Sequence, residues 1–314
     1  MIKVENLTKK YGGKAAVDNL SFEVKPGQVT GFLGPNGSGK STTMRLIVGL
    51  DRPNKGNILV NNSSITKFKR PMSEIGVLLD ADYVHPTRKA KNHLLAIAVS
   101  NGYGKKRVKE VLELVGLSEV ANKRVGKFSL GMKQRLGLAA VLIGNPKTVM
   151  LDEPANGLDP EGIRWIRDFL SLLAKEGRTV FASSHLLSEM ALMADELVVI
   201  GQGRLIEQTT VEAIRSKATG GFISLRTPNM EKLTSVLESS STSFTLDGDR
   251  FHIEASNSQE LGHLAFTHGI EIHELYRVEP SLEDAFLQIT SSTQEYSTTH
   301  FRPASAGEPK GGAS

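Results

Sequence analysis

The stretch GPNGSGKST, residues 34–42, constrains the fold of this 314-residue chain more than any other feature. It follows an apolar run at 29–33 and precedes a helical pattern at 40–49, an order that predicts a strand, a glycine-rich loop and a helix start. In such a loop the backbone N–H groups and the helix dipole can hold phosphate oxygens. A chance glycine-rich turn is the weaker alternative. The predicted nucleotide-binding residues of this loop are Gly34, Pro35, Asn36, Gly37, Ser38, Gly39, Lys40, Ser41 and Thr42.

Two of these side chains have specific expected roles. We expect Lys40 to neutralise the β and γ phosphates of a nucleotide, and Ser41 to offer its hydroxyl oxygen to Mg²⁺. A second acidic motif supports this, because the apolar run in TVMLDEP, residues 148–154, ends in two adjacent carboxylates. Successive side chains at a strand end point in different directions, so Asp152 is predicted to face the metal and Glu153 the attacking water. Loop solvation is the alternative for an isolated Asp–Glu pair.

Helical and strand-like patterns alternate through the first two thirds of the chain, which predicts an α/β fold with a largely parallel sheet covered by helices. Short strand-like runs come first, and a hairpin is expected at 197–207. The predicted helices are 40–49, 88–100, 105–115, 130–143, 160–175 and 185–193, and the predicted strands are 75–79, 148–151, 179–183 and 196–200.

A second, smaller unit is predicted after the glycine pair at 220–221. Its order of strand and helix signals is βαββαβ, which is typical of a ferredoxin-like α+β domain. Its last strand is expected at 270–278 and its last helix at 281–289, and from residue 291 the chain is rich in Ser, Thr, Gly and Pro without apolar periodicity. We therefore predict three regions, 1–218, 221–290 and a disordered tail at 291–314.

Composition excludes some function classes. No apolar run approaches the length of about 20 residues that a bilayer span requires, and no signal peptide is evident. The net charge of +4 is spread over short basic runs without interleaved aromatic residues, which favours solvated helix faces over nucleic-acid binding. The chain has no cysteine and hence no disulfide, which is compatible with the cytosol. We predict a cytoplasmic protein with no nucleic-acid partner.

Together with FSLGMKQR at 128–135, these motifs make the first 218 residues or so resemble the ATPases of the ATP-binding-cassette (ABC) family. The resemblance implies a P-loop ATPase domain with a mostly parallel sheet, an antiparallel β-subdomain and a helical subdomain. It implies ATP and Mg²⁺ as cofactors. The signature element, L-S-G-G-Q in the family, corresponds here to Ser129, Leu130, Gly131 and Met132, at a predicted helix start. There it would contact ATP held by a second copy, so a homodimer is expected.

Three further residues match positions with known roles in the family. Tyr11 lies where an aromatic ring stacks on adenine, Asp159 where a loop residue communicates across the dimer, and His185 where a switch histidine touches the γ-phosphate. Each has a plainer alternative. Tyr11 is then a strand-end aromatic, Asp159 a helix cap before Pro160, and His185 an ordinary residue at a helix start.

The chain departs from the family pattern at two places. Asp80 stands where the family usually has a glutamine that reaches Mg²⁺, so it either joins the metal shell or only solvates a loop. Asp82 is interpreted as a loop residue. In the signature, Leu130 and Met132 replace a glycine and the glutamine, and a modest effect on dimer closure is expected.

These departures, and the small C-terminal unit, resemble the subgroup of bacterial ATPases that serve drug or peptide-antibiotic exporters of the bacitracin type. The predicted function is ATP hydrolysis that drives an integral membrane permease, with the chain bound peripherally to the inner face of the cell membrane. A nucleotide-switched protein acting on ribosomes or DNA is the alternative, as is a resistance protein that senses and does not pump. The transported substrate and the identity of the permease stay open.

Overall fold

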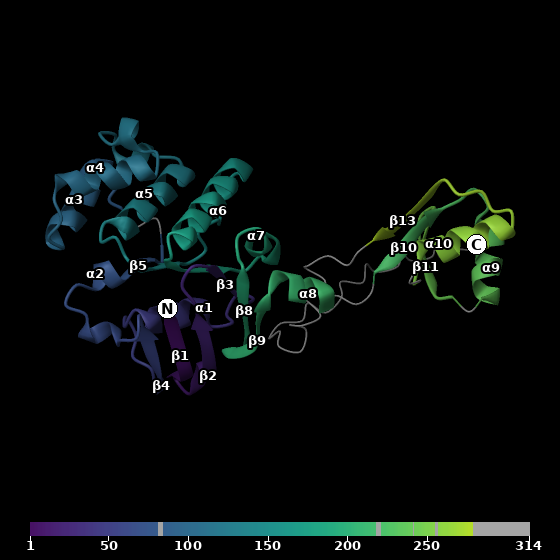
Figure 1. Ribbon diagram of the computed structural model, residues 1–314, viewed down its shortest axis with the longest axis horizontal. Helices are drawn as coiled ribbons and strands as arrows, with labels where there is room; N and C mark the ends of the chain where they lie inside the picture. The colour runs from purple at the N-terminus through teal and green to yellow at the C-terminus, as the bar shows by residue number, and fades with distance from the viewer. Residues whose placement is uncertain (81–83, 218–220, 241, 255–256, 279–314) are drawn as a thin grey trace, which may run out of the picture.

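The computed structural model describes residues 1–80, 84–217, 221–240, 242–254 and 257–278, without the side chains of 215–217. A six-stranded sheet forms the centre of the N-terminal unit, in the strand order β5-β6-β7-β3-β8-β9 (Figure 1). Its strands are β3 Val29–Leu33, β5 Ile75–Leu78, β6 Thr148–Leu151, β7 Thr179–Ser184, β8 Glu196–Gly201 and β9 Arg204–Thr210. All neighbours pair in parallel except β8 and β9. The carboxyl ends of β3, β6 and β7 therefore meet at one edge.

An antiparallel sheet packs against this centre. It contains β1 Ile2–Tyr11, β2 Lys14–Val24 and β4 Lys55–Val60, in the order β2-β1-β4. Phe22 of β2 stacks on Phe181 of β7, with ring centroids 5.7 Å apart, and lies 5.5 Å from the ring of Phe32 in β3. The two sheets therefore share one apolar core, which also buries the inner side of α1, Lys40–Ile47.

Helices make up the remainder of the N-terminal unit. Arg107 of α4, Lys105–Leu114, donates hydrogen bonds from its guanidinium group to the carbonyl oxygens of Leu142 and Ile143. These bonds tie α4 to the end of α5, Leu130–Leu142. The helical subdomain contains α3 Ala90–Ser100, α4 Lys105–Leu114 and α5 Leu130–Leu142, with the 3-10 turns η2 Ser118–Val120 and η3 Val125–Lys127. Elsewhere lie η1 Ile65–Lys67, α2 Pro71–Glu74, α6 Pro160–Lys175, α7 Leu187–Ala191 and α8 Val211–Lys217.

The C-terminal unit is a separate four-stranded antiparallel sheet with two helices and its own apolar core. Its strand order, β11-β12-β10-β13, is that of a ferredoxin-like fold and confirms the prediction from the βαββαβ pattern. The elements are β10 Phe222–Arg226, α9 Met230–Ser239, β11 Phe244–Asp247, β12 Arg250–Ile253, α10 Ser258–Thr267 and β13 Glu274–Val278.

Several elements are shorter than the sequence pattern predicts, and for two of them a local hydrogen bond gives the reason. The helix expected at 185–193 begins only at Leu187, because the Leu186 N–H donates to the Ser184 hydroxyl oxygen and holds the preceding turn. The strand expected at 270–278 begins at Glu274. Its first residues bond elsewhere: the Ile270 N–H donates to the Ala265 carbonyl at the end of α10, and the Glu271 N–H to the side chain of Asn229.

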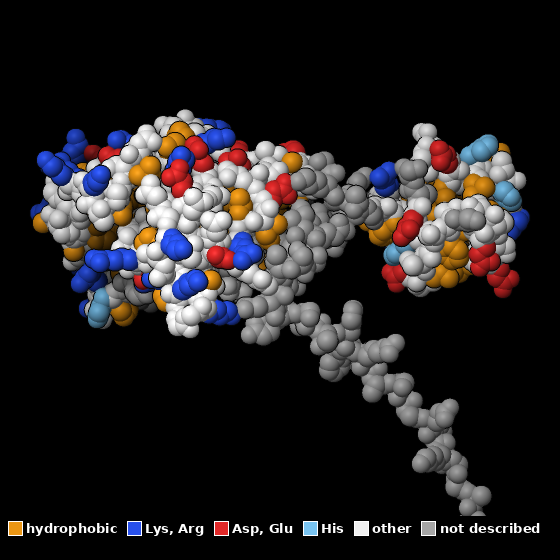
Figure 2. Space-filling model, turned by 90° about the horizontal axis from the view of Figure 1, so that it is seen from below, with side chains coloured by type: hydrophobic (Ala, Val, Ile, Leu, Met, Phe, Trp, Pro, Cys, Tyr) orange, Lys and Arg blue, Asp and Glu red, His pale blue; other side chains and the backbone are white. Residues whose placement is uncertain are grey.

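Some predictions lie outside the described residues. These are the loop assignment of Asp82, the helix at 281–289, the tail at 291–314 and the domain limits at 218 and 290, all of which stay predictions. Within the described part of the chain, no helix combines the length and apolar character needed to cross a bilayer. Figure 2 shows Lys and Arg side chains at several separate places on one face of the N-terminal unit.

Candidate nucleotide site

The glycine-rich loop at 34–39 connects β3 to α1, and its backbone is shaped for close approach. A Cβ atom on Gly34 would lie 2.5 Å from the Ile200 carbonyl oxygen, and one on Gly39 would lie 2.5 Å from the Ala16 carbonyl oxygen. Gly39 also has a φ of 102°, which favours glycine. The first N–H groups of α1 have no intrahelical acceptors, as in any α-helix, and no side chain caps them. Phosphate oxygens are suitable acceptors for them.

Lys40, the first residue of α1, directly follows this loop and is only 6% exposed. Its ammonium group donates to the carbonyl oxygens of Gly34 (2.7 Å) and Pro35 (3.4 Å), and lies 3.8 Å from the Glu153 carboxylate. Burial lowers the pKa of the Lys40 ammonium, and the attraction of Glu153 and Asp152 offsets this only in part. A bound phosphate would supply the negative charge that this buried cation lacks.

Ser41 and Asp152 bring two oxygen ligands together beside the loop. The Ser41 hydroxyl donates to Asp152 Oδ2 at 2.9 Å, although the two residues are far apart in the chain. The Ser183 hydroxyl donates to Asp152 Oδ1 and so fixes the carboxylate from the other side. A hydroxyl and a carboxylate are hard oxygen donors of the kind that Mg²⁺ prefers, and this cation commonly completes its shell with phosphate oxygens and water. The residues present therefore fit the cation.

Glu153 adopts a left-handed backbone conformation, with a φ of 48°, where the chain turns away from the end of β6. Its N–H donates to the Ser183 hydroxyl oxygen at 2.9 Å, and its Oε2 lies 2.8 Å from Nδ1 of His185. Such strain is typical of functional positions. The structure thus brings together Lys40, Asp152, Glu153 and His185, all predicted from the sequence, from three neighbouring strand ends.

Sequence reasoning missed Ser183. This buried serine is the second-last residue of β7, beside β6, and contacts both members of the acidic pair. The only signal was the first serine of the run ASSH, residues 182–185, at the end of an apolar strand pattern.

Tyr11 is half-exposed at the end of β1, and its hydroxyl donates to Asp51 at 3.1 Å. Arg45 of α1 donates to the same carboxylate at 2.8 Å, and the Lys9 ammonium lies 4.9 Å from the centre of the tyrosine ring. The Arg45 guanidinium is the main cause that lowers the pKa of Asp51. Sequence reasoning did not identify this cluster, which holds the ring at a fixed place. Stacking on adenine stays a prediction.

Asp80 is exposed and lies just past the end of β5. The Asp152 N–H donates to the Leu78 carbonyl oxygen at 2.8 Å, so the end of β5 lies beside the residue predicted to bind the metal. The position of Asp80 next to the site agrees with either of its two interpretations.

The signature residues form a second cluster. Ser129 caps α5 by accepting a hydrogen bond from the Met132 N–H at 3.3 Å, and Asp159 caps α6 by accepting one from the Gly162 N–H at 2.8 Å. The predicted helix start and helix cap are both present. Leu130 is 43% exposed, and a Cβ on Gly157 would lie 2.7 Å from one of its methyl carbons. Signature residues and Asp159 line one cavity of about 460 Å³. In the described residues, no hydrogen bond or ion pair joins this cluster to Lys40 or Glu153.

Comparisons with known proteins agree with this geometry. Residues 17–156 match the family described as ABC transporter, and residues 221–283 match a family described as a domain of unknown function. The ABC transporter ATP-binding protein YhcH of Bacillus subtilis (strain 168) is 38% identical over 300 residues, covering 94% of this chain and 97% of YhcH.

A second relative and a solved structure also match this chain over most of their length. The bacitracin transport ATP-binding protein BcrA of Bacillus licheniformis is 36% identical over 297 residues, covering 92% of this chain and 97% of BcrA. The dimeric structure of MJ0796, a bacterial ABC transporter cassette, is 25% identical with a TM-score of 0.61, covering 67% of this chain and 98% of MJ0796. The chain therefore belongs to the ATP-binding proteins of ABC transporters, and it is an ATPase.

Proposed function

We propose that this chain uses ATP hydrolysis to drive an exporter of antibiotic-like compounds, by closing and opening a homodimer bound to a separate membrane permease. The observation that carries this proposal is the contact of Lys40, Ser41, Asp152, Glu153 and His185 at adjacent strand ends. This is the set of groups that phosphoryl transfer to water needs: a phosphate cradle, a metal ligand set and a group to orient water.

In the proposed reaction, backbone N–H groups of the loop and the Lys40 ammonium hold the β and γ phosphates. Ser41 and Asp152 would hold Mg²⁺, which when bound neutralises charge on the phosphate oxygens. Glu153 orients the attacking water and accepts its proton at a carboxylate oxygen. His185 lies against that carboxylate at 2.8 Å and contributes a second polar group toward the γ-phosphate.

We propose that Asp80 adds a charged ligand, direct or through water, to the metal shell. The test is an Asp80→Asn variant titrated with Mg²⁺ in an ATPase assay, with Asp247→Asn, at an exposed aspartate of the C-terminal unit, as a control for the loss of one surface charge elsewhere. We expect the Mg²⁺ concentration for half-maximal activity to rise about tenfold, the lower end of the loss that is typical when a group supporting a metal shell is changed. An unchanged Mg²⁺ dependence would exclude Asp80 from the shell.

The homodimer is proposed because each half of the site needs the other copy. The signature residues lie apart from the phosphate loop in the same chain, so in a head-to-tail dimer Ser129 and the start of α5 would contact the phosphate held by the partner. The dimeric structure of MJ0796 supports this arrangement for a related cassette.

Export and its cargo rest on the relatives. BcrA, named for bacitracin transport, aligns over nearly the whole chain, including the C-terminal unit. We therefore propose a peptide-antibiotic or similar drug as cargo, a permease that selects it, and a position on the inner face of the cell membrane.

Purification of tagged Glu153→Gln protein from its own host, with ATP and Mg²⁺ and gentle solubilisation, tests the permease proposal. We expect a membrane protein with several spans to co-purify in stoichiometric amount, identified by mass spectrometry. A Lys40→Met variant, which should not retain ATP, is the matched control. Ribosomal proteins in place of a membrane protein, or no membrane partner, would contradict the proposal.

A further inference from the structure

The turn that joins β8 to β9 lies against the phosphate loop. The Gly203 N–H donates to the carbonyl oxygen of Ser38 at 2.9 Å. The end of β8 comes equally close to the start of the loop, because a Cβ atom on Gly34 would lie 2.5 Å from the Ile200 carbonyl oxygen. The sequence pattern predicted only a hairpin at this place, so the contact with the loop is a product of the tertiary fold.

Gly203 occupies a position that favours glycine for two reasons. β8 and β9 pair Gly201 with Arg204. The two residues between them, Gln202 and Gly203, have positive φ angles of 48° and 77°, as in the type I′ turns that two-residue hairpins prefer. In addition, a Cβ atom on Gly203 would lie 2.7 Å from the carbonyl oxygen of Ala16 in β2. Turn geometry and close packing together therefore fix the direction of the Gly203 N–H.

The strand β2 also holds the turn by hydrogen bonds. The Asp18 N–H donates to the Gly203 carbonyl oxygen at 2.9 Å. The Asp18 carboxylate oxygen Oδ2 accepts hydrogen bonds from Nε and Nη2 of Arg204, at 2.9 and 2.6 Å. This ion pair is too exposed to add much to stability, but its two hydrogen bonds restrict where the turn can lie. Gly203 is thus bound to β2 through its carbonyl group and to the loop through its N–H.

The hydrogen bond from Gly203 determines the direction of one amide of the loop. The Ser38 carbonyl and the Gly39 N–H belong to one trans peptide group, in which the C=O and N–H bonds point in opposite directions. Because the turn holds the Ser38 carbonyl oxygen, the Gly39 N–H points away from the turn. Within the residues that the structure describes, this N–H has no acceptor. It is therefore available to a phosphate oxygen bound at the start of α1.

We propose that Gly203 is a positioning residue of the nucleotide site, which orients the Gly39 N–H for phosphate binding by holding the Ser38 carbonyl group. Gly203 acts through this peptide group and does not contact the nucleotide. The inference rests on the proposed function, since it requires the loop to bind phosphate. If the bond served only the stability of the hairpin, its loss would lower the melting temperature and leave the nucleotide affinity unchanged.

Gly203→Ala tests the proposal, with Gly177→Ala, in the turn between α6 and β7, as the matched control. The φ angles of the two glycines are 77° and 84°, so alanine strains the backbone at both positions. A Cβ atom at Gly177 would meet no atom within 4 Å, whereas one at Gly203 forces the turn to shift. We expect the Kd for ADP with Mg²⁺, measured by calorimetry on the full chain, to rise about tenfold or more in Gly203→Ala. It should stay within about twofold in Gly177→Ala.

Equal ADP affinities of the two glycine variants would overturn the inference, whatever their melting temperatures. Lys40→Met separates this failure from failure of the proposed function. Full ADP affinity in Lys40→Met would contradict the loop as the phosphate site, and the inference with it. Affinity that is lost in Lys40→Met but kept in Gly203→Ala would contradict only the role of the turn.

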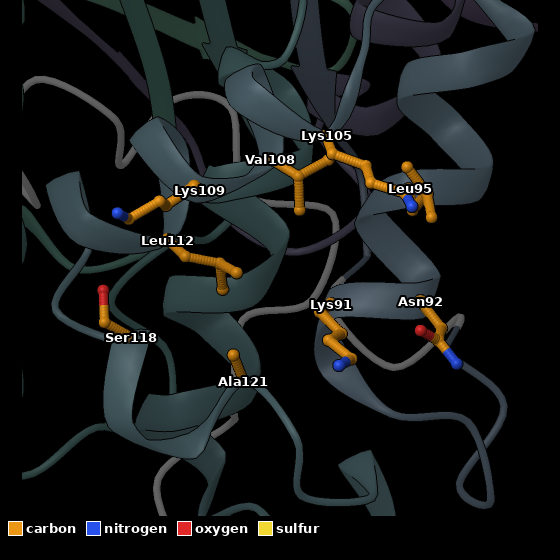
Figure 3. A pocket seen from close by; sticks show the side chains of 9 residues that line it. All are labelled: Lys91, Asn92, Leu95, Lys105, Val108, Lys109, Leu112, Ser118 and Ala121. Atoms are coloured by element: carbon orange, nitrogen blue, oxygen red, sulfur yellow. The ribbon is translucent and has the colours of Figure 1, made fainter.

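The ion pair of Asp18 and Arg204 gives a second measurement, which decides the question if Gly203→Ala does not fold. Arg204→Glu should raise the Kd for ADP about threefold, and addition of Asp18→Lys, which restores an ion pair with reversed charges, should return it to within about twofold. The control for reversing one charge is Lys109→Glu, at an exposed lysine that lines a pocket of the helical subdomain (Figure 3). Equal affinities of Arg204→Glu and Lys109→Glu, or no recovery in the double variant, would overturn the inference.

Discussion

The phosphate half-site, made of residues 34–42 with Asp152, Glu153 and His185, differs from the signature half-site, made of residues 129–132 with Asp159. In the first, side chains from separate segments contact one another. The hydroxyls of Ser41 and Ser183 both donate to Asp152, and Glu153 lies against His185. In the second, Ser129 and Asp159 only cap their own helices.

We infer from this difference that the phosphate half-site depends on the fold of one chain, whereas the signature half-site depends on a partner chain. Contacts between segments assemble the phosphate half-site within one chain. The signature half-site is a pair of helix starts around a cavity that no residue of the phosphate loop lines. Substitutions should therefore act on ATP binding in the first half and on dimer closure in the second.

The largest expected effect is that of Lys40→Met. ATP hydrolysis should fall by about a thousandfold or more, because the charge that faces the developing phosphate negative charge is lost. Nucleotide binding, measured by isothermal titration calorimetry, should be lost together with hydrolysis. Full ATP affinity in this variant would contradict the role given to the loop.

The same variant also allows a stability test. Since burial lowers the pKa of Lys40, folding disfavours its charged form, and the net cost is present below the folded-state pKa and disappears as the pH rises toward the unfolded value. The nucleotide-free Lys40→Met protein should then unfold at the same temperature as the unchanged protein or higher at pH 7, with a smaller difference at more alkaline pH. A clearly lower melting temperature at pH 7 would show that the cation stabilises the empty loop.

Ser183→Ala should have the next largest effect. It removes the hydroxyl that bridges Asp152 and the Glu153 N–H, and leaves buried polar groups without a partner, at a cost of about 1–3 kcal/mol in stability. We expect kcat to fall about tenfold through misplacement of the acidic pair. Ser184→Ala, which loses contacts to Glu189 and Leu186 instead, is the matched control and should retain more activity.

Leu130→Gly should act on the other half-site and more weakly. The change restores the glycine of the family pattern and removes the contact with Gly157. In protein that also carries Glu153→Gln, the ATP concentration for half-maximal dimer formation should change by about fivefold or less. ATP binding by the monomer should not change. Light scattering of size-exclusion fractions measures the first and calorimetry the second. A loss of monomer binding would show that the two half-sites are not separate.

Asp51→Asn should have the smallest effect. It weakens the contacts that fix Tyr11, so KM for ATP should rise about threefold, while kcat stays unchanged. Tyr11→Phe should give a similar increase, and the double variant no more than either alone. Additive effects would mean that Asp51 acts independently of the ring.

Local chemistry made much of this predictable. The glycine loop, the helix starts at Ser129 and Asp159, and the acidic end of β6 each depend on a few adjacent residues, and each lies where the sequence pattern indicated. Ser183 and Asp51 were missed because their partners lie 31 and 40 residues away in the chain, at contacts that only the tertiary fold creates.

The most direct test of the central claim, that the phosphate half-site hydrolyses ATP through Glu153, is one measurement on the Glu153→Gln variant. ATP turnover and ATP-dependent dimer formation are followed in the same sample. We predict that turnover falls by at least about 100-fold, while ATP still binds and holds the dimer closed, since the amide can no longer accept the proton of water. Hydrolysis near the unchanged rate would contradict the assignment of Glu153.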